Sequence, residues 1–176
     1  MIKKTFTFLS VALLFVSTAF AADKNEAITA QAQCQAERVA ADDMLENAEL
    51  SQALADAAKL AAEQARGNCT DPELLALGDS VADQAEQVYN MALFDIANGH
   101  NDYNEASDRE AYGDQAFDDD DWALAIIWYT DGSMNPPRSP ATEWYLDAYS
   151  DYGLGDGGFE SAMYAWGEAE SIYNGE

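Results

Sequence analysis

The sequence is poor in basic residues: 8 Lys and Arg stand against 33 Asp and Glu, and the formal net charge of the 176 residues is −25. Nucleic-acid binding needs clustered Lys and Arg, so nucleic acid is a poor partner for this chain. Anionic membrane is repelled for the same reason. The shortage is steepest after Gly67, where the only Lys and Arg residues are Arg109 and Arg138.

The chain also lacks any motif typical of a catalytic or cofactor site, and His100 is its single histidine. A catalytic dyad or a zinc site needs further His or Cys residues, and none lies near His100. The run Gly153–Gly158 has the glycines of a phosphate loop, but no Lys follows it and its surroundings are acidic. We therefore expect this run to be a flexible turn between two helices, and we expect no enzymatic activity.

Long apolar runs are absent except at the N-terminus. The first four residues carry two lysines, Phe6–Val16 is a short apolar stretch, and Ala19-Phe20-Ala21 offers small residues around a cleavage point. This layout predicts a bacterial signal peptide at residues 1–21, since the apolar stretch is too short to span a bilayer. The mature chain is then expected to begin near Ala22 and to be periplasmic or secreted. Loss of the two lysines would change its net charge from −25 to −27.

Two explanations of the acidity stay open. Carboxylates can simply keep the surface solvated, or adapt it to a salty habitat. Alternatively, the negative charge serves to bind a cationic partner, either a basic protein or peptide or a divalent metal ion. Disorder is a weaker third explanation, because 48% of the residues are hydrophobic and the chain has four Trp and nine Tyr.

Cysteine is scarce, and Cys34 and Cys69 are the only two. In an oxidising compartment, a disulfide between them is the simplest prediction, and it would stabilise the fold by about 3–4 kcal/mol. Residues 26–66 contain fourteen alanines and neither Gly nor Pro, so they are predicted to be helical. An unbroken helix would hold the cysteines about 50 Å apart, and a disulfide excludes that distance. We therefore expect an antiparallel helical hairpin that turns near Ser51 and is tied by the disulfide.

A third helix is predicted to begin at Pro72, because Thr70-Asp71-Pro72-Glu73 combines capping side chains with a first-turn proline. Asn98-Gly99 is predicted to end this helix, and residues 100–107 to form a polar loop. All four Trp and eight of the nine Tyr follow residue 100. This change divides the mature chain into a helical segment, 22–100, and an aromatic-rich segment, 101–176, which are expected to pack as one unit.

Two stretches of the aromatic-rich segment share a pattern of small and aromatic residues. The first has Gly113, Ala125-x-x-x-Tyr129, Gly132 and Pro137, and the second has Ser150, Ala162-x-x-x-Trp166 and Ala169. With this pattern, residues 108–173 resemble tetratricopeptide and Sel1-like helical repeats, although Ala116 and Gly153 replace the family's aromatic residues. The resemblance implies an all-α, repeat-like stack of antiparallel hairpins with a partner-binding groove.

The densest acidic run is Asp118–Asp121, and Asp114 lies one helical turn before it. Calcium takes several oxygen ligands at once, so Asp114, Asp118, Asp120 and Asp121 are candidate metal ligands. The run lacks the glycine and the final glutamate of an EF-hand loop. The alternative is a solvated loop in which Asp121 caps a helix that starts at Trp122.

Aromatic residues that are neighbours in the sequence must point in different directions on a helix, so some of them are expected at the surface. The candidate partner-binding residues are Trp128, Tyr129, Trp144, Tyr145 and Tyr149. We expect them to line a groove with acidic rims, which would bind basic and apolar side chains through cation–π and charge contacts.

The sequence as a whole predicts an exported, acidic, all-α protein that binds a cationic protein or peptide without catalysis. Neither nucleic acid nor a membrane is expected as a partner once the leader is removed. One alternative is a calcium-responsive protein that uses residues 114–121, and calcium would then be its only cofactor. Another is an inhibitor or immunity-type protein that neutralises a basic toxin or hydrolase.

Overall fold

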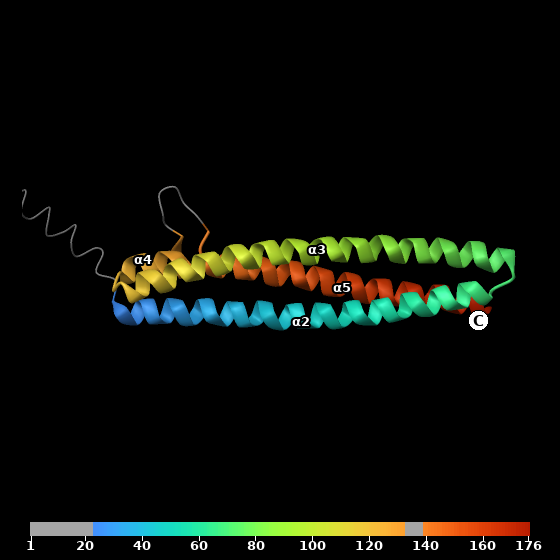
Figure 1. Ribbon diagram of the computed structural model, residues 1–176, viewed down its shortest axis with the longest axis horizontal. Helices are drawn as coiled ribbons and strands as arrows, with labels where there is room; N and C mark the ends of the chain where they lie inside the picture. Colours follow the sequence, from blue (N-terminus) through green and yellow to red (C-terminus); the bar gives the residue numbers. More distant parts are fainter. Residues whose placement is uncertain (1–22, 133–138) are drawn as a thin grey trace, which may run out of the picture.

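The computed structural model describes residues 23–132 and 139–176, so the signal peptide predicted at residues 1–21 lies outside the described residues. The described chain is helical and has no strand, which confirms the all-α prediction. Its elements are α2 (Lys24–Asn68), α3 (Pro72–Asp118), α4 (Trp122–Ile126), the π-helix η1 (Ile127–Asp131) and α5 (Ala141–Asn174). The three long helices lie side by side in an elongated bundle (Figure 1). None of the described helices is long and apolar enough to cross a membrane.

The first long helix, α2, is unbroken over 45 residues, so the predicted hairpin with a turn near Ser51 is wrong. Asp23 caps its N-terminus through a capping box with Glu26. Ser51 lies inside the helix, and its hydroxyl donates a hydrogen bond to Asp156 of α5. The alanine-rich sequence therefore forms one rod, as helix propensity alone would favour.

The two cysteines are free thiols, so the predicted disulfide between Cys34 and Cys69 is also wrong. Cys34 is fully buried inside α2, whereas Cys69 is the partly exposed C-cap of the same helix. At about 1.5 Å per residue, the continuous helix separates them by about 50 Å. A disulfide requires Cα atoms within about 7 Å, so the rod excludes the bridge.

We expect the two thiols to differ in reactivity. Burial, together with the nearby Glu110 carboxylate, raises the pKa of the Cys34 thiol to about 12, so little thiolate is present at neutral pH. Ellman's reagent should therefore titrate one thiol in the native protein and both after denaturation, and Cys69→Ser should remove the native signal. A disulfide detected by mass spectrometry in the folded, oxidised protein would contradict this expectation.

The helix α3 begins as predicted: the Asp71 side chain accepts hydrogen bonds from the backbone N–H groups of Glu73 and Leu74, and Pro72 is the first residue. The predicted end at Asn98-Gly99 and the loop at 100–107 are wrong, since α3 continues to Asp118. Gly99 is buried, and a Cβ atom there would lie 2.6 Å from the ring of Tyr152. Its role is close packing inside the bundle, not the end of a helix.

The helix α5 is continuous as well, so Gly153–Gly158 is not a turn. A Cβ atom on Gly155 would lie 2.5 Å from Ile96 of α3, and one on Gly158 would lie 2.8 Å from Ala92. These glycines let the two backbones approach. The second stretch with the repeat-like pattern therefore lies within a single helix, and the resemblance to helical repeats stays a prediction.

Small residues line the packed side of every long helix at intervals of seven. In α2 they are Ala27, Cys34, Ala41, Ala48, Ala55 and Ala62; in α3, Gly78, Ala85, Ala92, Gly99, Ala106 and Gly113; in α5, Ala141, Ala148, Gly155, Ala162 and Ala169. A seven-residue period keeps one side of each helix against its neighbours.

In α5 an aromatic residue follows each small residue by four positions. We call these residues the aromatic column: Tyr145, Tyr152, Phe159, Trp166 and Tyr173. Ala125 and Tyr129, in α4 and η1, repeat the same spacing. The pattern Ala-x-x-x-aromatic is thus a property of the seven-residue period of α5.

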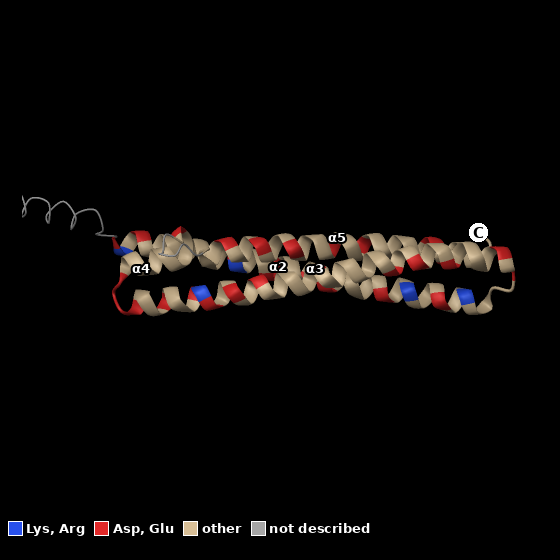
Figure 2. Cartoon of the chain, turned by 90° about the horizontal axis from the view of Figure 1, so that it is seen from above, with Lys and Arg blue, Asp and Glu red and all other residues tan. Residues whose placement is uncertain are grey.

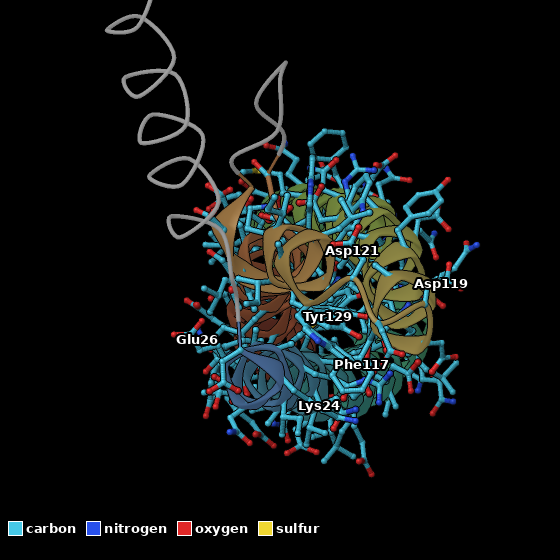
Figure 3. All side chains as sticks on the ribbon, turned by 90° about the vertical axis from the view of Figure 1, so that its left-hand side faces the viewer. Lys24, Glu26, Phe117, Asp119, Asp121 and Tyr129 are labelled. Carbon is cyan, nitrogen blue, oxygen red and sulfur yellow. The ribbon has the colours of Figure 1, made fainter. Side chains whose placement is uncertain are left out.

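The aromatic column separates α2 from α3. These two helices pack extensively on α5 and have few contacts with each other. Viewed along the bundle, Tyr129 lies among the helices, whereas Glu26 and Asp119 point outward (Figure 3). The core is therefore a row of large rings, most of them from α5, inserted between two helices that present mainly small residues.

Candidate functional site

The hydroxyl groups of three core tyrosines reach a row of polar side chains that lies between α2 and α3. At 2.6–2.8 Å they donate to carboxylates of α3: Tyr129 to Asp114, Tyr145 to Glu110 and Tyr173 to Asp79. The same carboxylates accept hydrogen bonds from α2: Asp114 from Gln31, Glu110 from Arg38 and Asp79 from Arg66. We call this row the polar seam, and it links the two helices that the aromatic column holds apart.

Two of the three carboxylates of the polar seam are paired with an arginine of α2: Glu110 with Arg38 and Asp79 with Arg66. Hydrogen bonds from Arg66 and Tyr173 lower the pKa of Asp79 to about 2. Burial and the hydrogen bond to Glu110 raise the pKa of Tyr145 well above its usual value. The tyrosine hydroxyl is therefore a stable donor at neutral pH, and these contacts position the helices.

Two residues of the aromatic column, Phe159 and Trp166, have no hydroxyl group. At their level, Tyr89 of α3 lies between α2 and α3. Its ring centroid lies 5.2 Å from that of Phe159 and 5.3 Å from that of Trp166. Lys59 of α2 lies over Trp166 and forms an ion pair of 2.6 Å with Glu86. A cavity of about 160 Å³ opens beside these residues between α2 and α3. Lys59, which lines this cavity, is already paired with Glu86, so its charge is not available to bind an anionic ligand.

The candidate metal ligands have separate structural roles. Asp114 accepts hydrogen bonds from Tyr129 and Gln31, and Asp118 is the last residue of α3. Asp120 adopts a left-handed backbone conformation with φ of 59°, which Asp tolerates better than most residues. Asp121 caps α4 by accepting from the backbone N–H of Leu124, which confirms the capping alternative. Among the described residues, no group of three or more His, Cys, Asp or Glu side chains could hold a metal ion.

The five aromatic residues expected in a groove are divided between core and surface. Tyr129 and Tyr145 are fully buried, so the prediction that they face a partner is wrong. Trp128 is half-buried against Tyr112, with ring centroids 4.9 Å apart. Trp144 is also half-buried, at the edge of the core. Of the five, only Tyr149 has an exposed side chain, at 41%.

A surface that the sequence analysis missed lies where α3 packs on α5. Asp95 and Asp102 of α3 face Asp147 and Asp151 of α5, and burial together with these neighbouring charges raises the pKa of Asp102 and Asp151. No ion pair between described residues involves any of the four carboxylates. The cluster therefore has an uncompensated negative charge.

Exposed apolar side chains lie on the same two helices. Met91, Phe94 and Leu154 are 67%, 66% and 58% exposed. Gly158 contacts Ala92 and Gly155 contacts Ile96, so the Met91–Phe94 segment of α3 lies level with the end of the Leu154–Gly158 segment of α5. We call the four aspartates Asp95, Asp102, Asp147 and Asp151 the α3–α5 face. The pairing of the two helices brings these four residues together, although the seven-residue spacing of Asp95 with Asp102 is visible in the sequence.

The chain matches no family model, and it shows no significant similarity to a curated protein or to a solved structure.

Proposed function

We propose that this chain is an exported, acidic helical module that binds a basic protein or peptide and performs no catalysis. The observation that carries the proposal is that the few Lys and Arg side chains of the described residues contact groups of the same chain. Four of the described ones form ion pairs within the bundle: Arg38, Lys59, Arg66 and Arg109. A fifth, Lys24, lies over the rings of Phe117 and Trp122 at 5.9 and 5.0 Å.

The carboxylates, in contrast, greatly exceed the cations. Asp and Glu are distributed along all three long helices, whereas Lys and Arg are few (Figure 2). Between residues 141 and 174, α5 has seven Asp and Glu and neither Lys nor Arg. Such a surface attracts a basic partner and raises the rate of encounter, and the attraction is screened beyond about 8 Å at physiological salt.

Two features of the sequence support an interaction role outside the cytoplasm. The N-terminal pattern favours export, and the protein recovered from the cell envelope should then begin near Ala22. The resemblance of residues 108–173 to helical repeats favours partner binding, because such repeats commonly serve interactions.

The proposal predicts a salt-sensitive basic partner. Immobilised mature chain, residues 22–176, should retain a basic protein or peptide from an envelope extract at low salt and release it at high salt. A test variant in which four exposed carboxylates of α5 are neutralised should retain less of this partner. Its substitutions are Glu143→Gln, Asp147→Asn, Glu160→Gln and Glu168→Gln. Retention by this variant that equals the wild type, or an empty capture by both, would contradict the proposal.

A further inference from the structure

We propose that the cavity between α2 and α3 binds a small organic cation, namely a compact apolar group that carries an ammonium or amidinium. The inference goes beyond the proposed function and does not depend on it, because the ligand is a small molecule and not a protein. It depends on three features of the cavity: its size, its aromatic floor and the unpaired carboxylates at its rim.

The cavity exists because one inward position of α3 has a small side chain. Its volume is about 160 Å³, and Ala82 of α3 lines it. The other residues of α3 that lie at seven-residue steps from Ala82 are all larger, and all are buried or half-buried. They are Leu75, Tyr89, Ile96, Tyr103, Glu110 and Phe117. A cavity of about 150 Å³ holds a molecule of the size of benzene, so this one has room for a compact apolar group.

The floor of the cavity is apolar and buried. Trp166 and Tyr173 of the aromatic column line it together with Ala62 of α2, and each of these residues is less than a tenth exposed. The face of the Trp166 ring already attracts an ammonium of the chain, since Nζ of Lys59 lies 5.4 Å from the ring centroid. The floor therefore suits an apolar group that has a positive charge beside it.

The cations of the cavity are compensated within the chain. Lys59 and Arg66 of α2 both line it, in the half of the bundle that holds the C-terminus (Figure 1). Each is paired with a carboxylate of α3 at 2.6 Å, Lys59 with Glu86 and Arg66 with Asp79. Neither charge is free to bind an anionic ligand.

Two further carboxylates define the charge of the ligand. Glu63 of α2 and Asp83 of α3 line the cavity and are exposed, so they lie at its rim. Neither takes part in an ion pair between described residues. They belong to the two helices that border the cavity, so a cation at the rim would be attracted from both sides. An anion would be repelled there, and a neutral molecule would gain nothing from these charges.

The experiment compares three probes that share a phenyl ring and differ in charge: benzylamine, which is protonated at neutral pH, benzyl alcohol and benzoate. Binding to the mature chain is measured by calorimetry, and the indole N–H signals of isotope-labelled tryptophan report contact with Trp166. We expect benzylamine to bind about fivefold more tightly than benzyl alcohol, a gain that an exposed ion pair can supply. Benzoate should bind least.

Two variants separate the contribution of the cavity from that of its rim. Ala82→Leu should weaken benzylamine binding about tenfold or more without lowering the melting temperature, because the added carbons fill a space that already exists. Glu63→Gln with Asp83→Asn should weaken benzylamine binding about fivefold and leave benzyl alcohol binding within about twofold. This rim variant tests the site even if Ala82→Leu does not fold.

Matched controls change exposed residues that do not line the cavity. They are Ala97→Leu for the added side-chain volume, and Glu49→Gln with Asp108→Asn for the same change in net charge. Both should leave the affinity for benzylamine within about twofold.

Several results would overturn the inference. Equal binding of benzylamine and benzyl alcohol, or tightest binding of benzoate, would show that the site does not select a cation. No binding of any probe, or binding that Ala82→Leu leaves unchanged, would show that the cavity is not the site. Equal weakening by the charge control would show attraction by net charge alone. The proposed function is tested separately by the capture of a basic protein, so it can stand if this inference fails.

Discussion

Replacing Phe159 with Ala is expected to lower the free energy of unfolding by about 3–5 kcal/mol. Phe159 is fully buried in the aromatic column and packs against the ring of Tyr89 at a centroid distance of 5.2 Å. Most of the buried residues in its core cluster are alanines, whose side chains cannot move to fill the space. A cavity would therefore remain, and the lost contacts would not be replaced.

Chemical denaturation followed by circular dichroism measures this loss. Tyr164 offers a matched control in the same helix, because its side chain is 71% exposed. Tyr164→Ala should change stability by no more than about 0.5 kcal/mol. Equal effects of the two substitutions would show that the aromatic column does not form the core of this bundle.

Two glycine-to-alanine substitutions are expected to have opposite signs. At Gly99, a Cβ atom would lie 2.6 Å from the ring of Tyr152 and 3.3 Å from the carbonyl oxygen of Ala148. Tyr152 is fully buried and its hydroxyl is hydrogen-bonded to His100, so the ring has little room to move. Gly99→Ala should therefore destabilise the protein by about 1–3 kcal/mol, despite the better helix propensity of alanine.

At Gly157, nothing lies within 4 Å of the position of a Cβ atom. Gly157→Ala should therefore stabilise the protein by about 0.5–1 kcal/mol through helix propensity alone. The difference between the two variants in thermal and denaturant unfolding isolates the packing effect. Stabilisation by Gly99→Ala would rule out the close contact between α3 and α5 at this level.

Local signals predicted several elements correctly. The alanine-rich run without Gly or Pro predicted the helical character of α2, and the caps at Asp71 and Asp121 marked the starts of α3 and α4. Such signals act within a few residues, so they can be recognised without knowing the neighbouring helices.

Helix continuity was harder to predict. Asn98-Gly99 and Gly153–Gly158 have the composition of helix ends and turns, yet both lie inside long helices. The disulfide prediction failed for a related reason, since it required α2 to turn near Ser51. Inside a helix, glycine is less favourable than alanine by about 1 kcal/mol. The burial of an aromatic ring against the glycine can outweigh that cost.

The candidate surface also depends on contacts between helices that local sequence signals do not predict. Asp95 and Leu154 lie far apart in the sequence, and the antiparallel contact of α3 with α5 brings their segments together. Tyr129 and Tyr145 were expected at the surface from their aromatic neighbours, but their rings are buried and their hydroxyls bind Asp114 and Glu110. No local feature distinguishes a tyrosine that a carboxylate satisfies in the core from one that faces a partner.

The sequence by itself determined the helical class, the starts of α3 and α4 and the excess of negative charge. Composition, caps and the absence of Gly and Pro are sufficient for these properties because they act locally or add over the whole chain. Only the tertiary structure decided which glycines are contacts, which tyrosines are core and which carboxylates share a surface. Each of those depends on the residue across the interface, and the register between two helices assigns that residue.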